Sequence, residues 1–396
     1  MNKKVFIPAI FGVIIVVFII AKMTIGGNES SCRGRGAKPV VVDTINESLH
    51  SQVINIYIEN SGSMAGYFNS NSIIKDIIKE YYDRISESCK DGDTIKLNYI
   101  NTDIENFNGD IKNYLASTQK RCKASFTKVD DILSLAMREC NDSTIAILVS
   151  DFCFTSNDGS LSMAASDITK IFTKQRDKNR NLCVAIYKYM SDFNGKYYPG
   201  GIPCKKPLPF YLWIFGYGHQ VKNIVNLPIK KDNCGYFLLQ PNQNVAAEVL
   251  TKNARMVDGN SIIVKEWKRD RYRRGSEEDI YSLKLRVNLG NLVLSENEIS
   301  NLDSYRLSEG YELSAVERMD NDNYIFNIVT NRPSPGKLNI AYIMEEMPAW
   351  ISSSNFTGKG IPNDSTTLGI KDLIEGVYDS YHNSSDRYFT ISITLK

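Results

Sequence analysis

The chain has 396 residues, of which 42% are hydrophobic, so it is long enough to bury more than one core of ordinary size. Its 47 Lys and Arg against 45 Asp and Glu leave a formal net charge of +2. Because this balance is nearly neutral, no field over the whole molecule favours nucleic acid as a partner. We therefore expect two domains, and the partner must be inferred from local motifs.

The N-terminus has the features of a membrane-targeting segment. Lys3 and Lys4 precede an uncharged apolar run from Val5 to Ala21, which is near the lower length limit for a helix that spans a bilayer. No small-x-small cleavage site follows the run, which favours an uncleaved signal-anchor over residues 1–22, with a removed signal peptide as the alternative. Residues 23–50 then form a linker. A single-pass membrane protein whose bulk is extracytoplasmic is expected.

The residues that enzymes commonly use are scattered. The three histidines, His50, His219 and His382, lie far apart on different predicted elements, which argues against a histidine-based triad. No G-x-x-x-x-G-K-[ST] phosphate loop occurs. Eight cysteines without a C-x-x-C pair make a zinc site unlikely and leave the disulfide state open. We therefore predict that the chain is not an enzyme.

Residues 51–232 alternate between short apolar runs and stretches of helical period. This pattern predicts strands joined by crossover helices in a doubly wound, mostly parallel α/β sheet. A hairpin or loop is expected at 194–201, where turn residues interrupt the apolar runs. The expected strands cover 53–58, 94–100, 144–149, 182–187 and 210–215, and the expected helices 73–85, 129–136 and 161–174.

Oxygen-bearing side chains follow three of these elements. Glu59, Ser61 and Ser63 come after the first strand, Thr127 precedes a helix, and Asp151 follows the strand at 144–149. Loops at the carboxyl ends of parallel strands meet at one edge of a sheet, where open α/β folds bind their ligands. Carboxylate and hydroxyl oxygens suit hard dications, so these residues predict a site for Mg²⁺, Mn²⁺ or Ca²⁺.

The runs Ser61-Gly62-Ser63-Met64, Ser125-Phe126-Thr127 and Leu148-Val149-Ser150-Asp151 resemble a known motif. It is the metal-ion-dependent adhesion site (MIDAS) of von Willebrand factor type A (vWA) domains, written D-x-S-x-S followed by a Thr and an Asp. The resemblance covers residues 50–230, and it departs from the family at Glu59, where the motif has aspartate. It implies a bound dication and a protein partner that supplies a carboxylate to the metal. In the alternative interpretation, Ser61, Ser63 and Asp151 are only turn and helix-cap residues.

Beyond residue 232 the pattern changes to a period of two, which indicates half-buried antiparallel strands. A β-sandwich is the natural solution for such strands, so residues 233–396 are expected to form a β-rich scaffold or interaction domain. One helix, 373–381, interrupts it, and the loop 350–367 before this helix offers a contact surface. The expected strands cover 281–289, 324–329, 338–343 and 389–395.

Together these features predict a membrane-anchored extracytoplasmic protein that binds a protein partner through a divalent metal. The membrane contact is expected through the N-terminal helix, with no nucleic-acid partner and no small-molecule substrate. The alternative is a structural subunit of an envelope or membrane complex, in which the change to Glu59 has left a degenerate, metal-free site.

Overall fold

The computed structural model separates into two units, Met1–Ser48 and Leu49–Lys396, and the second unit is described below. The predicted signal-anchor (1–22) and linker (23–50) lie outside the described residues. Among the residues that the structure describes, no helix has the length and apolar character needed to cross a membrane. The described residues are 51–69, 72–124, 128–153, 161–198, 200–229, 234–250, 254–258, 261–264, 268–270, 280–358, 360–383 and 385–395.

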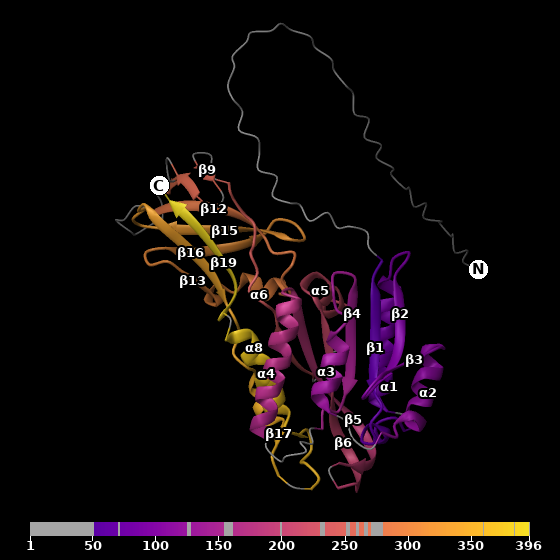
Figure 1. The fold of residues 1–396 in the computed structure, drawn as a ribbon. Coiled ribbons are helices and arrows are strands. Elements are labelled where there is room, and N and C mark those ends of the chain that lie inside the picture. The colour runs from indigo at the N-terminus through magenta and orange to yellow at the C-terminus, as the bar shows by residue number, and fades with distance from the viewer. Residues whose placement is uncertain are drawn as a thin grey trace, which may run out of the picture. The chain divides into compact units, whose positions relative to one another are not determined.

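The first part of the chain forms a seven-stranded sheet with the order β3-β2-β1-β4-β6-β5-β7 (Figure 1). Strand β1 pairs in parallel with β2 and β4, and β5 runs in the same direction, whereas β3, β6 and β7 run the opposite way. The predicted mixed α/β architecture with a mostly parallel sheet is therefore confirmed. The strands are β1 (Val53–Glu59), β2 (Thr94–Ile100), β3 (Ile104–Phe107), β4 (Thr144–Ser150), β5 (Leu182–Tyr197), β6 (Ile202–Tyr217) and β7 (Gly235–Leu239).

Helices cover both faces of this sheet. Along β1, Ile54, Ile56 and Ile58 pack into one apolar cluster and Tyr57 into another, as expected for a strand buried on both sides. The cluster of the three isoleucines contains the buried faces of α1 (Ile73–Ser88), α2 (Ile111–Arg121) and α5 (Gly218–Val225). The cluster of Tyr57 contains those of α3 (Val129–Met137), α4 (Leu161–Lys178) and α8 (Ile370–His382).

Strands β5 and β6 form one continuous hairpin. They pair with each other from Leu182 opposite Tyr217 to Tyr197 opposite Ile202. The turn residues at 194–201 are thus the end of this hairpin. The strands are longer than the apolar runs at 182–187 and 210–215 predicted, because polar residues and prolines interrupt the pattern in their outer parts.

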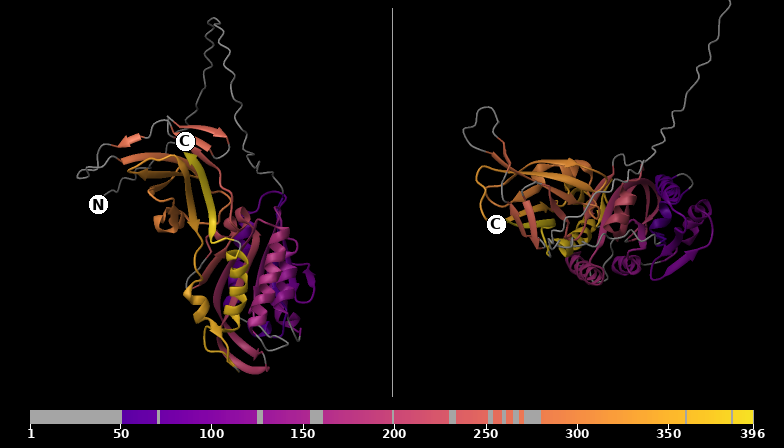
Figure 2. Two further views of the ribbon diagram at one scale, coloured as in Figure 1. Left: turned by 60° about the vertical axis from the view of Figure 1, so that its left-hand side comes forward. Right: turned by 90° about the horizontal axis from the view of Figure 1, so that it is seen from above.

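Helix α8 packs in the layer that covers the seven-stranded sheet, although it comes late in the sequence. It lies beside α4, as Figures 1 and 2 show. The hydroxyl of Thr169 donates to the carbonyl of Gly376 over 2.9 Å, and the hydroxyl of Tyr381 donates to the carbonyl of Leu182 over 2.8 Å. Part of the region 233–396, which the sequence assigns to a second domain, therefore packs on the α/β layer, as does β7.

Two further five-stranded sheets follow, and their pairings are antiparallel except for β10 with β19, while β17 (Asn355–Phe356) and β18 (Thr367–Leu368) form a separate two-stranded parallel sheet. The period-two pattern predicted β12, β15, β16 and β19. One sheet has the order β13-β16-β19-β10-β9, and in the other β8 joins the path β11-β12-β15-β14. The strands are β8 (Ala247–Val249), β9 (Ala254–Asp258), β10 (Ser261–Val264), β11 (Lys268–Asp270), β12 (Ile280–Asn288), β13 (Tyr305–Leu307), β14 (Glu312–Arg318), β15 (Asn323–Thr330), β16 (Gly336–Ile343) and β19 (Arg387–Leu395).

The buried residues of these two sheets share one core. Leu283, Leu285 and Val287 on β12 lie in the same apolar cluster as Ile340 on β16 and Phe389 on β19. The remaining short elements are α6 (Glu296–Ser300) and α7 (Ala349–Ser353), with single turns of 3₁₀ helix at η1 (Met64–Gly66) and η2 (Leu302–Ser304).

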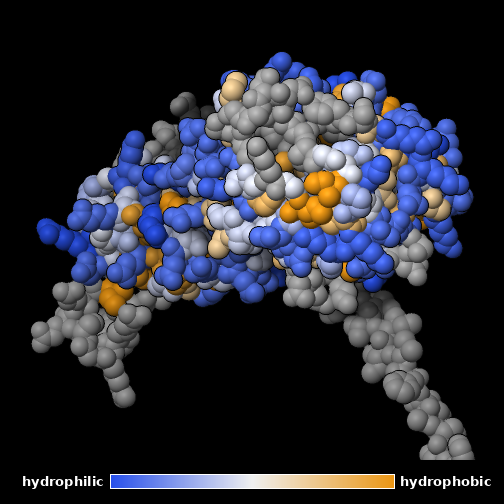
Figure 3. Space-filling view, turned by 90° about the horizontal axis from the view of Figure 1, so that it is seen from below, coloured by the Kyte–Doolittle hydropathy of each residue, from blue (hydrophilic) through white to orange (hydrophobic). Residues whose placement is uncertain are grey.

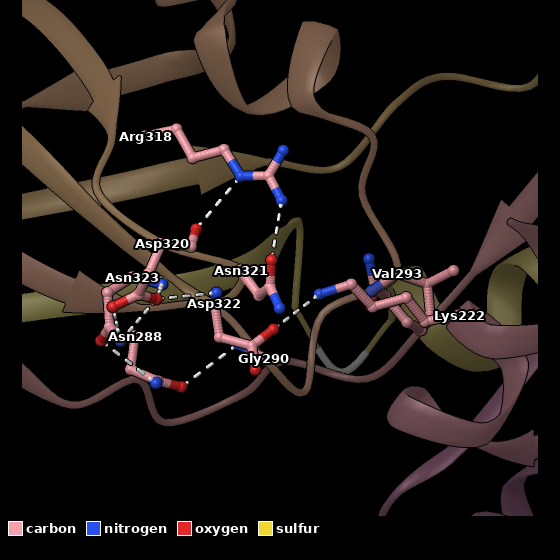
Figure 4. A network of polar contacts seen from close by, with 10 residues as sticks. Lys222, Asn288, Gly290, Val293, Arg318, Asp320, Asn321, Asp322 and Asn323 are labelled. Carbon is pink, nitrogen blue, oxygen red and sulfur yellow. Dashed lines mark hydrogen bonds and ion pairs between the residues drawn. The ribbon is translucent and has the colours of Figure 1, made fainter. Parts of the chain in front are cut away.

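Helix α5 contacts the turn between β14 and β15 through polar groups (Figure 4). The ammonium of Lys222 forms an ion pair with Asp322 at 3.3 Å. At the start of the same helix, a Cβ on Gly218 would lie 1.9 Å from the carbonyl oxygen of Asn291, so only glycine permits this backbone approach. These contacts tie the seven-stranded sheet to the antiparallel part of the chain.

Candidate metal centre

The loop that follows β1 is fixed by backbone hydrogen bonds to a neighbouring segment. The amide of Gly62 donates to the carbonyl of Ala124 over 2.9 Å, and Ser61 forms an isolated parallel bridge with the same residue. The amide of Met64 donates back to the carbonyl of Ser61 over 3.2 Å, which starts the single turn η1. The chain therefore leaves the buried strand at Glu59 and turns at once, with its hydroxyls held at the edge of the sheet.

Side chains from the loops after β1 and β4 lie close together. The hydroxyl oxygens of Ser61 and Ser63 are 2.9 Å apart, and the Ser63 hydroxyl lies near enough to the Asp151 carboxyl to lower its pKa. Strands β1 and β4 are parallel neighbours, so these side chains lie at their common carboxyl edge.

Glu59 contacts the same edge from the last position of β1. Its carboxylate accepts a hydrogen bond from the hydroxyl of Ser150, the last residue of β4, and that hydroxyl also accepts from the amide of Phe152 over 2.8 Å. The site residues are buried, with exposed fractions of 3% for Glu59, 6% for Ser61, 7% for Ser63 and 5% for Asp151. Two carboxylates and two hydroxyls are thus held together away from bulk water.

Burial dominates the electrostatics of this site. It raises the pKa of the Asp151 carboxyl, against the opposing effect of hydrogen bonds from the amide of Cys153, at 3.1 Å, and from Ser63. Burial likewise raises the pKa of the Cys153 and Cys122 thiols, and the charges of Asp151 and Glu59 raise both further. These carboxylates therefore lie in a poorly solvated environment, where a bound cation would offset their charge.

The chemistry of the donor set fits a hard dication. The Ser61 and Ser63 hydroxyls lie 2.9 Å apart beside the Asp151 carboxyl, and a hydroxyl oxygen has two lone pairs, so it is able to bind a cation as well as to take part in a hydrogen bond. Hydroxyl and carboxylate oxygens are the ligands that Mg²⁺ and Ca²⁺ take in proteins. Within the described part of the chain, no group of three or more His, Cys, Asp or Glu side chains is placed to hold a metal. The donors here instead combine two carboxylates with two hydroxyls.

Four of the five residues that the sequence predicts as ligands lie at this edge, namely Glu59, Ser61, Ser63 and Asp151. The fifth, Thr127, lies outside the described residues, although Ala124, shortly before it, contacts the loop after β1. Sequence analysis missed the part that Ser150 plays as the partner of Glu59. It also missed that Tyr197 and Tyr198 lie next to Cys153. The only signal for these tyrosines was the turn composition around them.

No family model, no curated protein and no solved structure matches the chain. The interpretation of the site therefore depends on the residues and their geometry alone.

Proposed function

We propose that this chain is a membrane-anchored, extracytoplasmic vWA-like protein that binds a protein partner through a divalent metal. The observation that carries the proposal is that the Ser61 and Ser63 hydroxyls, 2.9 Å apart, lie beside the Asp151 carboxyl, so side chains from two separate loops come to one point of the sheet edge. The helices on both faces of the sheet agree with the doubly wound arrangement of the vWA family.

The ion, Mg²⁺, Mn²⁺ or Ca²⁺, would be held by Ser61, Ser63 and Asp151 together with Glu59 and the predicted ligand Thr127. Bound there, it supplies positive charge that attracts a carboxylate of the partner. Glu59 is one methylene longer than the aspartate of the motif, and its reach extends to Ser150 on the neighbouring strand. The protein side chains therefore set the position of the ion, and the partner completes its shell.

The described surface on the side toward which β1 and β4 run resembles ordinary protein surface. Figure 3 shows the face from below, toward which β1 and β4 run in Figure 1. It is largely hydrophilic, and its hydrophobic side chains gather in small areas. Permanent interfaces are more apolar than this, whereas interfaces that form and dissociate resemble ordinary protein surface. On this proposal the two antiparallel sheets form a β-sandwich-like scaffold behind the binding domain.

A structural, metal-free role is the second candidate, and one observation favours it. The carboxylate of Glu59 accepts from the Ser150 hydroxyl, and that of Asp151 has the Cys153 amide as a donor, without an ion. A protein with such a site is able to fold without an ion and to serve as a fixed subunit of an envelope or membrane assembly. The two candidates differ in whether ions stabilise the protein.

Thermal unfolding of the full-length chain with Mg²⁺, Mn²⁺, Ca²⁺ or EDTA separates these candidates. An ion that binds only the folded state at a hundredfold excess over its Kd adds about 2.7 kcal/mol to the free energy of unfolding. The double variant Ser61→Ala/Ser63→Ala should lose this gain. The control is Ser117→Ala on α2, which removes a hydroxyl that is hydrogen-bonded to the Tyr99 hydroxyl and to the Tyr114 carbonyl. This variant should keep the stabilisation by the ion. A wild-type melting curve that no ion shifts supports the structural role.

Partner binding and topology need separate measurements. If the metal mediates binding, capture of the partner on immobilised protein should be lost with EDTA and restored by excess Mg²⁺. Protease treatment of intact and permeabilised cells tests the location of the chain. Digestion of residues 51–396 in intact cells is expected for an extracytoplasmic protein.

A further inference from the structure

The β5–β6 hairpin extends beyond the sheet that holds it. Strand β6 pairs with β4 as far as Tyr211 opposite Ser150, and β5 pairs with β7 as far as Lys188 opposite Gly235. Past these points the two strands pair only with each other, and Figure 1 shows them continuing beyond the end of β4. We call residues 189–198 and 200–210 the outer hairpin. Its backbone ladder is separate from the rest of the sheet.

The outer hairpin lies on the loop after β1 through side-chain contacts. The ring of Phe193 meets that of Tyr67 edge to face, with centroids 4.9 Å apart. The Tyr67 hydroxyl donates to the carbonyl of Pro209 over 2.6 Å, and the Asn69 side chain donates to the carbonyl of Asn194 over 2.8 Å. The hairpin is therefore attached to the loop that carries Ser61 and Ser63.

Two glycines allow the outer hairpin to approach this loop closely. A Cβ on Gly195 would lie 2.7 Å from the Cα of Gly66, and a Cβ on Gly66 would lie 2.4 Å from the ring of Phe193. Neither glycine has a positive φ, so the close approach and not the backbone conformation requires them. At Gly66 and Gly195 the backbones of the loop and of the hairpin are therefore in close contact.

The end of the outer hairpin lies over the candidate metal centre. The Cys153 thiol donates to the carbonyl of Tyr198 over 2.7 Å and contacts the hydroxyl of Tyr197 at 3.4 Å. On the other side, a Cβ on Gly62 would be 3.7 Å from the Tyr198 hydroxyl. Tyr197 and Tyr198 therefore contact the loops after both β1 and β4. In this form Ser63 and Asp151 are only 7% and 5% exposed.

Prolines occur along the outer part of β6. Pro203, Pro207 and Pro209 on β6 stand opposite Lys196, Asp192 and Met190, and proline has no N–H to donate. In the inner part of β6, from Tyr211 to Tyr217, the sequence contains no proline. The carbonyl of Pro209 accepts from the Tyr67 hydroxyl, so the backbone at this position faces away from β5. The prolines therefore prevent a further strand from pairing along this side of β6, and the hairpin leaves the sheet here, where a hinge would lie.

We propose that the outer hairpin is a hinged cover of the metal centre, released when the centre exchanges its ion or receives an acidic side chain of the partner. This inference rests on the proposed metal-dependent function. It explains how a buried site takes part in binding: the closed form shown here excludes the partner, and the partner binds the form with the hairpin displaced. The population of that open form then sets the apparent affinity.

The rate at which bound Mn²⁺ leaves the full-length chain after addition of excess EDTA tests the cover, with free Mn²⁺ followed by electron paramagnetic resonance. Phe193→Ala removes the contact with Tyr67, and Gly195→Ala forces the backbones apart. Both leave the predicted ligands in place. Each should release Mn²⁺ faster, on the order of tenfold or more, because the open form is more populated. Phe107→Ala is the matched control, since its ring meets Tyr99 edge to face at the far edge of the sheet, and it should release at the wild-type rate.

Each outcome decides a different point. If the wild-type chain binds no Mn²⁺, the proposed function fails and the cover fails with it. If it binds Mn²⁺ but the hairpin variants release it at the wild-type rate, or Phe107→Ala accelerates release equally, the cover is wrong and the function stands. Should circular dichroism show that Phe193→Ala or Gly195→Ala is unfolded, Asn69→Ala replaces it, because it removes the bond to Asn194 without emptying a core position.

Discussion

Ser150 and Glu59, the last residues of two neighbouring parallel strands, are joined by a hydrogen bond from the serine hydroxyl to the glutamate carboxylate. The same hydroxyl accepts from the amide of Phe152, a residue with a left-handed backbone conformation at φ 45°. One buried hydroxyl therefore fixes both the acid that departs from the vWA motif and the turn that leads into the loop after Asp151.

Replacing Ser150 by Ala should destabilise the protein even without metal. The change removes one hydrogen bond from the Glu59 carboxylate and one from the Phe152 amide, and loss of a hydrogen-bond partner at a buried site costs about 1–3 kcal/mol. Urea unfolding in EDTA measures the loss. In a double-mutant cycle with Glu59→Gln, a coupling energy near zero would show that the bond contributes nothing.

Stabilisation by an added ion should increase with pH. The raised pKa of Asp151 means that the folded state binds a proton where the unfolded state has released it, so ion-free stability decreases as pH rises through this window. An ion needs the deprotonated carboxylate and competes with that proton. The shift in Tm caused by Mg²⁺ should be smaller at about pH 5 than at about pH 7.5. An equal shift at both values contradicts a direct role of Asp151.

Lys188 provides a second pH dependence, away from the site. Its ammonium donates to the hydroxyl of Ser354 over 2.6 Å and to the carbonyl of Ser365 over 2.7 Å, and burial lowers its pKa from 10.5 to about 8. Between about pH 8 and 10.5 the unfolded state therefore binds more protons, and stability increases with pH across this window. Below it, the cost of burying the charge is fully present.

The variant Lys188→Met keeps the length of the side chain without its charge. The difference in unfolding free energy between wild type and variant should change in favour of wild type as pH rises from about 8 to 10.5. Denaturant unfolding at several pH values measures this difference, in which the titration of other groups cancels. A difference independent of pH would mean that Lys188 is not desolvated.

At Gly376, α8 approaches the backbone of α4 closely. A Cβ there would lie 2.5 Å from the carbonyl oxygen of Ala165, which belongs to backbone and cannot rotate away. Gly376→Ala should therefore cost about 1–3 kcal/mol by overpacking. Glu375→Ala, one residue earlier and partly exposed, is the control and should be nearly neutral. Equal stability of the two variants would show that the helices move apart freely.

Much of the first sheet follows from local pattern. The run Val53–Ile58, in which only Asn55 is polar, predicts a strand that is buried on both faces. The isoleucines of α1 repeat at helical spacing, which predicts a helix that buries one face. The outer hairpin does not follow in this way. Its residues around Asp192 and Lys196 are polar and proline-rich, and they are held by contacts with a loop more than a hundred residues earlier.

The candidate site shows the same division. That Glu59, Ser63 and Asp151 meet at one edge follows from the rule that the ends of parallel strands converge. That Ser150 takes up one oxygen of Glu59 does not follow, because it depends on the reach of a side chain across the sheet. The packing partner of α8 could not be predicted either. The spacing of its apolar residues predicts an apolar face, but only the tertiary structure shows that α4 covers it.

The late position of α8 in the chain has a consequence for biogenesis. The ribosome delivers β1 early and Ile370–His382 almost last, with the antiparallel sheets made in between. Until then the flank of α4 that Gly376 will contact stays bare. A nascent chain interrupted before residue 370 therefore presents an unfinished apolar surface to chaperones and proteases, so quality control is able to recognise a truncated product.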